Sequence, residues 1–177
     1  MHVAVTEESI EKANALFWEQ MLAMQLSPIG ACDASTDIAV ETGKVRCIGA
    51  EHVVGSCDLS GAWSGRIEVR LSRGLALQAT SAMLMQPVNQ VQPVDTLDAT
   101  KEIANMIAGT LKSALPRPCT MTVPDAAVES RDFCILPRTP DSITVFFHHA
   151  SGELMVRVWE QTTEAESENG TYAQLCA

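Results

Sequence analysis

A carboxylate and a carboxamide stand three residues apart in the segment 98–115, whose apolar residues recur with the spacing of a helix. At about 100° per residue, one narrow stripe of that helix carries Asp98, Glu102, Asn105, Gly109 and Lys112. The acid and the amide can project together from a solvent-facing stripe, and the glycine leaves room for another molecule to come close. We therefore expect this stripe to act inside the active site of another molecule.

The opposite side of the same helix is predicted to be its buried face. It carries Ile103, Met106, Ile107, Leu111, Ala114 and Leu115. Pro116 and Pro118 are expected to end the helix, because proline lacks a backbone donor and restricts the residue before it.

The Glu-x-x-Asn pattern is weak by itself, since short motifs match by chance and a lone copy usually lies on an ordinary solvated face. It occurs at Glu11–Asn14, Glu102–Asn105 and Glu166–Asn169. Only the middle copy has a preceding Asp, a following glycine and a strongly amphipathic helix around it. In the first copy, Trp18 stands where the motif helix has Gly109, and its indole would hold a partner off the helix. We interpret that copy as degenerate, or as a solvated first turn, and the third as chance.

The pattern Asp98-x-x-x-Glu102-x-x-Asn105 resembles the signature of the CheC/CheX/FliY family of chemotaxis phosphatases. Its continuation, Met-Ile-Ala-Gly109-x-x-Lys112, resembles CheX-type members in particular.

Other segments resemble the same family in the expected order. The stretch 58–72 is similar to its glycine-punctuated hairpin, and Met121–Pro124 is similar to its strand ending in proline. The pair 142–148 and 152–161 resembles its final hairpin. The resemblance covers roughly residues 50–161, and more weakly the first helix.

This resemblance implies an α+β fold: a single CheC-like domain, with an antiparallel or mixed sheet and two long pseudo-symmetric helices on one face. It implies hydrolysis of the aspartyl phosphate on a CheY-like response regulator. Asn105 would hold the attacking water and Glu102 would pair with the regulator's lysine. The protein would need no cofactor of its own, because the regulator brings its Mg²⁺.

The remaining stripe residues would bind the partner. Asp98 would support docking or orient Glu102, and Lys112 would contact the regulator. Gly109 would permit close approach, although a role in packing the helix is an alternative reading. CheX-type members also imply a homodimer paired through strand edges, for which the apolar runs Thr144–Phe147 and Leu154–Trp159 are candidates.

Composition excludes several classes of function. The chain of 177 residues has 46% hydrophobic and 19% charged residues, which is typical of a globular domain. Its formal net charge of −10 argues against binding to nucleic acid or to an anionic membrane surface. The start of the chain is acidic and has no apolar run, so we expect no signal peptide and a cytoplasmic protein.

The cysteines and histidines do not indicate a metal site. Six cysteines are scattered without a Cys-x-x-Cys pair, so neither a zinc site nor a redox pair is signalled. Cys57 and Cys134 are most simply small core residues. His148 and His149 are adjacent at the end of a predicted strand, where side chains alternate faces, so their imidazoles should point apart.

The remaining elements follow from periodicity and turn signals. Helices are expected over Thr6–Leu26 and, as a short buried helix, over Gly74–Met85, with a loop over Gln86–Leu97. Strands are expected within 36–59, with a turn near Thr42-Gly43, and over 65–72, 119–123, 128–136, 142–148 and 153–161. One domain would span 1–163, followed by an acidic tail at 164–177 that is expected to be poorly ordered.

Two other functions stay open at this point. The same fold could serve as a non-catalytic adaptor that binds a signalling or flagellar protein, which a damaged Glu-x-x-Asn motif would favour. It could also be a sensory domain that buries a small ligand between sheet and helices, which would require polar groups converging in the core.

Overall fold

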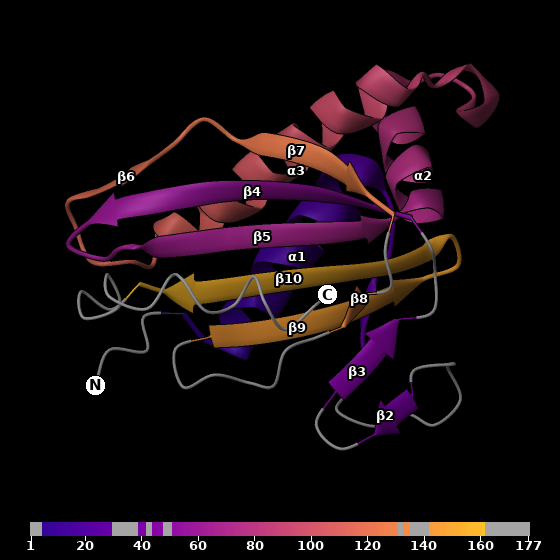
Figure 1. Cartoon of the computed structure of the whole chain (residues 1–177). Helices are drawn as coiled ribbons and strands as arrows, with labels where there is room; N and C mark the ends of the chain where they lie inside the picture. Colours follow the sequence, from indigo (N-terminus) through magenta and orange to yellow (C-terminus); the bar gives the residue numbers. More distant parts are fainter. Residues whose placement is uncertain are drawn as a thin grey trace.

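The computed structural model describes residues 5–29, 39–41, 44–47, 51–130, 133–134 and 142–161, with side chains for 5–29, 51–130 and 142–161. These residues form an α+β fold in which a seven-stranded sheet carries the two long helices on one face (Figure 1). The implied fold class is therefore confirmed. The predicted turn at Thr42-Gly43 and the acidic tail at 164–177 lie outside the described residues.

Every strand pair in the main sheet is antiparallel. The order is β1 (Ser27–Pro28), β9 (Ser142–His149), β10 (Gly152–Glu160), β5 (Gly65–Ser72), β4 (His52–Gly61) and β6 (Cys119–Met121), and β7 (Asp125–Glu129) also pairs with β4. A second sheet contains β2 (Ala39–Glu41), β3 (Lys44–Cys47) and β8 (Phe133–Cys134). The predicted strand 128–136 is thus divided between β7 and β8, which belong to different sheets.

Strand β5 fixes which face of the sheet is buried. Its alternating Ile67, Val69 and Leu71 have no exposed surface, as the sequence predicts for a half-buried strand. Ile67 lies opposite Cys57 of β4 and Val158 of β10, so the apolar positions of the three central strands share one face. The helices cover this face, which forms the core.

Helix α1 (Glu7–Leu22) begins as predicted at an N-cap threonine. The Thr6 hydroxyl accepts a hydrogen bond from the Ser9 backbone N–H, and the Thr6 backbone N–H donates one to the Ser9 hydroxyl. The helix ends earlier than expected, at Leu22, because Ala23 adopts a left-handed conformation with φ of 52°. Met21, in the last turn of the helix, is 63% exposed.

Helix α2 (Arg73–Leu84) is buried on one face only, through Leu75, Ala76, Ala79 and Thr80. The predicted helix is present, but it is not buried throughout, since Met85 at its end is 93% exposed. No described helix is long and apolar enough to cross a membrane.

Helix α3 (Pro93–Lys112) begins within the segment predicted as a loop. Pro93 occupies the first helical turn, where its missing N–H is no loss, and the Gln92 N–H donates to the Asp95 carboxylate over 2.9 Å. The loop itself contains the short 3₁₀ helix η1 (Val88–Gln90). The predicted loop over Gln86–Leu97 is therefore too long, because it includes the first turn of α3.

Candidate functional site

The motif helix α3 lies on the sheet through one apolar face. Ile103, Ile107 and Leu111 are at most 2% exposed, and Leu115 beyond the helix end is also buried. Met106 packs partly against the same core. Ala114 is exposed, contrary to expectation, because the helix ends at Lys112 and the following residues turn.

A glycine of the sheet lets α3 approach closely. A Cβ atom at Gly55 of β4 would lie 2.8 Å from the carbonyl oxygen of Thr100 and 3.1 Å from the Ala104 side chain. Thr100 and Ala104 are themselves buried, and the Thr100 hydroxyl donates to the Thr96 carbonyl over 2.8 Å. The middle of α3 is thus held directly against the central strands, which gives its outer face a fixed position.

The predicted stripe forms that outer face. Asp98, Glu102 and Gly109 are exposed, while Asn105 and Lys112 are partly exposed. Neither the Glu102 carboxylate nor the Asn105 amide has a hydrogen bond or ion pair among the described residues. A free acid and a free amide therefore lie one helical turn apart on a rigid, accessible surface.

Asp98 has a partner on its own helix. Its Oδ1 lies 3.1 Å from the Nζ of Lys101, and both side chains are substantially exposed. An exposed pair of this kind contributes at most about 1 kcal/mol, so it would not hold Asp98 against a competing contact. The described contact of Asp98 is with Lys101 and not with Glu102.

Gly109 does not pack against any of the described residues. A Cβ atom built on it would meet nothing within 4 Å. The described residues give no support to the alternative reading as a helix-packing glycine, and the close approach of helix and sheet occurs instead at Gly55 of β4, on the buried side of α3. Because Gly109 has no side chain, the helix backbone is uncovered at this position of the stripe, one turn after Asn105.

The asparagine of the first Glu-x-x-Asn copy lies in the core and not on a solvated turn. Asn14 and Trp18 are fully buried, so Trp18 cannot hold a partner off α1 and Asn14 is not part of a solvated turn. The Asn14 amide donates to the Ile10 carbonyl over 2.8 Å and accepts from the Trp18 indole over 3.2 Å. This asparagine is a structural residue of the core.

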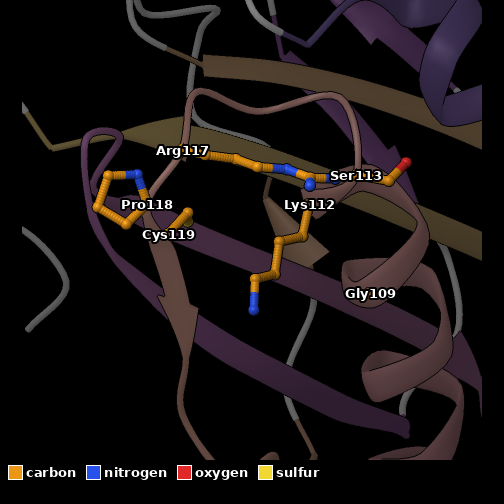
Figure 2. A pocket seen from close by; sticks show the side chains of 6 residues that line it. All are labelled: Gly109, Lys112, Ser113, Arg117, Pro118 and Cys119. Carbon is orange, nitrogen blue, oxygen red and sulfur yellow. The ribbon is translucent and has the colours of Figure 1, made fainter.

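A surface cavity of about 760 Å³ continues the stripe past Gly109. Its lining residues are Gly109, Lys112, Ser113, Arg117, Pro118 and Cys119 (Figure 2). Sequence reasoning identified the first two and missed the others, because the cavity forms only where the chain after α3 turns back to β6. The one indication of this site in the sequence is Arg117, a basic residue that follows the end of the helix closely.

The other candidate groups do not assemble into a metal site among the described residues. His148 is exposed and His149 is half-buried, with its Nδ1 accepting from the Ser151 N–H over 3.0 Å. Cys57 is buried in the core as predicted, and burial raises the pKa of its thiol to about 11. The side chain of Cys134 lies outside the described residues.

Comparison with known proteins agrees with this geometry. The family model for the chemotaxis phosphatase CheX matches residues 53–148, which include the hairpin β4–β5 and all of α3. None of the curated proteins searched matches the sequence.

Solved structures share the fold at low sequence identity. A chemotaxis protein CheX from Vibrio vulnificus is 19% identical, with 91% of this chain and 100% of that chain covered and a TM-score of 0.65. CheX from Desulfovibrio desulfuricans is 20% identical, with 87% and 97% covered and a TM-score of 0.63. The CheX of a CheX–CheY–BeF₃–Mg²⁺ complex from Borrelia burgdorferi is 17% identical, with 88% and 97% covered and a TM-score of 0.58.

Proposed function

Because the chain belongs to the CheX family of chemotaxis phosphatases, we propose that it hydrolyses the aspartyl phosphate of a CheY-like response regulator. The observation that carries this proposal is the pair of the exposed Glu102 and the partly exposed Asn105, neither of which has a partner among the described residues. A helix that presents unpaired polar groups on a rigid platform is suited to entering the phosphorylation site of another protein.

Asn105 would position the nucleophile. Its amide oxygen accepts a hydrogen bond from a water molecule and holds the water oxygen in line with phosphorus, without adding charge. Attack by this water breaks the bond between phosphorus and the aspartyl oxygen, so the regulator regains its carboxylate and inorganic phosphate leaves. Such a reaction depends mainly on position and on charge neutralisation, and Mg²⁺ bound by the regulator would supply the latter.

Glu102 would fix the register of the docked helix. Its carboxylate would form a charge-assisted hydrogen bond with the active-site lysine of the regulator. Asp98 and Lys112 would contact the regulator at either end of the stripe, and the bare surface at Gly109 would let it approach α3. In the relative from Borrelia burgdorferi, CheX was solved together with CheY, BeF₃ and Mg²⁺.

The test is to mix the protein with radiolabelled phospho-regulators from the same organism and to follow the label. We expect one of them to lose its label faster than by its own hydrolysis. Binding of a phospho-regulator without faster loss of label would instead indicate a non-catalytic adaptor.

The cavity described above opens at the surface near the end of α3, so it gives no support to a sensory domain with a ligand buried between sheet and helices.

We also propose a homodimer formed through strand β9. Strand β10 pairs with both β9 and β5, so the run Leu154–Trp159 is central and cannot be the edge. Among the described residues, the outer side of β9 is covered only by the short β1, where Ser27 and Pro28 pair with His148 and Phe147, and by Ile29, whose N–H donates to the Phe146 carbonyl over 2.8 Å. Light scattering should give about twice the 19.1 kDa of one chain, and a mass near 19.1 kDa would refute the dimer.

A further inference from the structure

Most of the positive charges of the described side chains are paired with carboxylates of the same chain. The ion pairs are Lys12–Glu8, Arg66–Asp58, Arg70 with Glu68 and Glu129, Arg73–Glu51 and Lys101–Asp98. Arg157 lies 5.2 Å from the centre of the Trp159 ring. Among the lysines and arginines whose side chains are described, Arg157, Lys112 and Arg117 therefore have no ion pair, and the last two line the cavity at the end of α3.

These two cations are also the free donors of that cavity. The Ser113 hydroxyl donates to the Thr110 carbonyl over 2.7 Å, and the Cys119 thiol lies 3.7 Å from the Trp63 carbonyl. Lys112 extends from the last turn of α3 into the space beside β6, and Arg117 extends from the following segment back toward the helix end (Figure 2). Two unpaired cations in one cavity repel each other, and an anion placed between them would remove that cost.

The cavity lies close to the residues that would enter the regulator. Gly109 lines it and follows Asn105 by four residues, which corresponds to about 6 Å along the helix. A stable protein interface covers about 800 Å² on each partner, so a regulator docked on Asn105 would extend over the cavity. The whole chain carries a net charge of −10. Two neighbouring cations without an ion pair, Lys112 and Arg117, therefore stand out on its described surface.

We propose that this cavity receives a carboxylate side chain from the docked response regulator, held between Lys112 and Arg117. The inference rests on the proposed function for the identity of the partner. A guanidinium binds a carboxylate through two parallel hydrogen bonds, and the ammonium of Lys112 adds a second charge from the other side. The site would select regulators that carry an acidic residue at the matching place.

Charge reversal tests the proposal. The probe is the CheY-like regulator loaded with beryllofluoride and Mg²⁺, titrated against wild type, Lys112→Glu, Arg117→Glu and the double variant. Arg73→Glu is the matched control, because Arg73 is exposed and lies beyond Ser72, at the opposite end of the sheet from the Gly61–Cys119 pair beside the cavity. We expect the double variant to bind on the order of 100-fold more weakly and each single variant about 10-fold, with the control within about twofold.

A carbodiimide cross-link identifies the carboxylate. The reagent activates a carboxylate and is released as a urea when the Lys112 amine displaces it, which leaves an amide bond between the two proteins. We expect a cross-linked peptide that contains Lys112 and an acidic residue of the regulator. Lys112→Arg should bind like wild type without giving that peptide.

The outcomes separate this inference from the proposed function. Equal affinity for wild type, Lys112→Glu and Arg117→Glu overturns the carboxylate site, even if the wild type removes the phosphoryl label. Charge-dependent binding without loss of label supports the site and refutes the hydrolysis. If wild type binds none of the loaded regulators of its organism, both proposals fall.

Discussion

Asn14 accepts a hydrogen bond from the indole Nε1 of Trp18 over 3.2 Å, and both side chains are fully buried. The same Glu-x-x-Asn spacing on α3 leaves Asn105 partly exposed and without a partner among the described residues. Two copies of one short pattern therefore have opposite roles, one in the core and one on the surface.

Replacement of the buried asparagine should cost stability. Asn14→Ala leaves the Trp18 N–H buried without its acceptor, and such a loss costs about 1–3 kcal/mol in the free energy of unfolding. Urea denaturation measures this value. The folded variant should bind a regulator as tightly as wild type, and an unchanged unfolding curve would contradict the structural role of Asn14.

The two glycines around α3 should respond in opposite ways to alanine. Gly109→Ala adds a methyl group to open space and should stabilise the protein by about 0.5–1 kcal/mol, the usual preference for alanine within a helix. Gly55→Ala brings a methyl group against the Thr100 carbonyl and should destabilise it by about 1–3 kcal/mol. Thermal unfolding of the two variants tests this, with a higher melting temperature than wild type expected for Gly109→Ala and a lower one for Gly55→Ala.

A large side chain at Gly109 should separate folding from docking. We expect Gly109→Trp to fold as well as wild type, since none of the described residues lies within 4 Å of the added Cβ. Its bulk should nevertheless prevent the regulator from approaching Asn105. Undiminished binding of the loaded regulator by a folded Gly109→Trp protein would exclude this surface from the interface.

Reversal of charge at Glu102 should abolish docking. Glu102→Lys places a like charge against the regulator's lysine, where such a contact costs several kcal/mol. Folding should be unaffected, because the exposed Glu102 has no partner among the described residues and a lysine there can pair with Asp98 one turn earlier. Titration with the regulator loaded with beryllofluoride and Mg²⁺ measures the affinity of both proteins. Equal affinity for wild type and variant would remove this salt bridge from the mechanism.

Stability should fall in mild acid because of His52. Burial lowers the pKa of this histidine from its usual 6.5, the charge of Arg70 lowers it further, and Glu153 and Glu129 partly oppose them. The unfolded chain therefore takes up a proton at a higher pH than the folded protein does. The contribution of the neutral His52 to the free energy of unfolding is therefore fully present above pH 6.5 and is lost as the pH falls below that value.

Urea unfolding between pH 8 and pH 5 measures this dependence. The variant His52→Gln lacks the titrating group, so its free energy of unfolding should decline less over the same range. Identical slopes for wild type and variant would show that His52 does not carry the effect.

The apolar period of α3 made its orientation predictable. Ile103, Ile107 and Leu111 recur with helical spacing, and burial of that row leaves Glu102 and Asn105 facing outward. The start of the helix differs from the predicted loop over Gln86–Leu97, because Pro93 is well suited to a first helical turn.

The features that were missed depend on contacts between distant segments. A polar residue such as Asn14 is expected at the surface, and only the packing of α1 against the sheet shows that Trp18 and Asn14 are enclosed together. Arg117 joins Lys112 in one cavity because the chain after α3 returns to pair Cys119 with Gly61 of β4. Local spacing carries no information about such a return.

Loss of label from a phosphorylated CheY-like regulator, compared between wild type and Asn105→Ala, tests the central claim most directly. Asn105 is partly exposed and without a partner among the described residues, so its truncation should change the free energy of unfolding by only a few tenths of a kcal/mol, roughly the range of surface substitutions. Because a misplaced catalytic group costs on the order of 100-fold in rate, the variant should leave the regulator to its own slow hydrolysis while still binding it. Dephosphorylation by Asn105→Ala at the wild-type rate would contradict the assignment of Asn105 and the proposed mechanism with it.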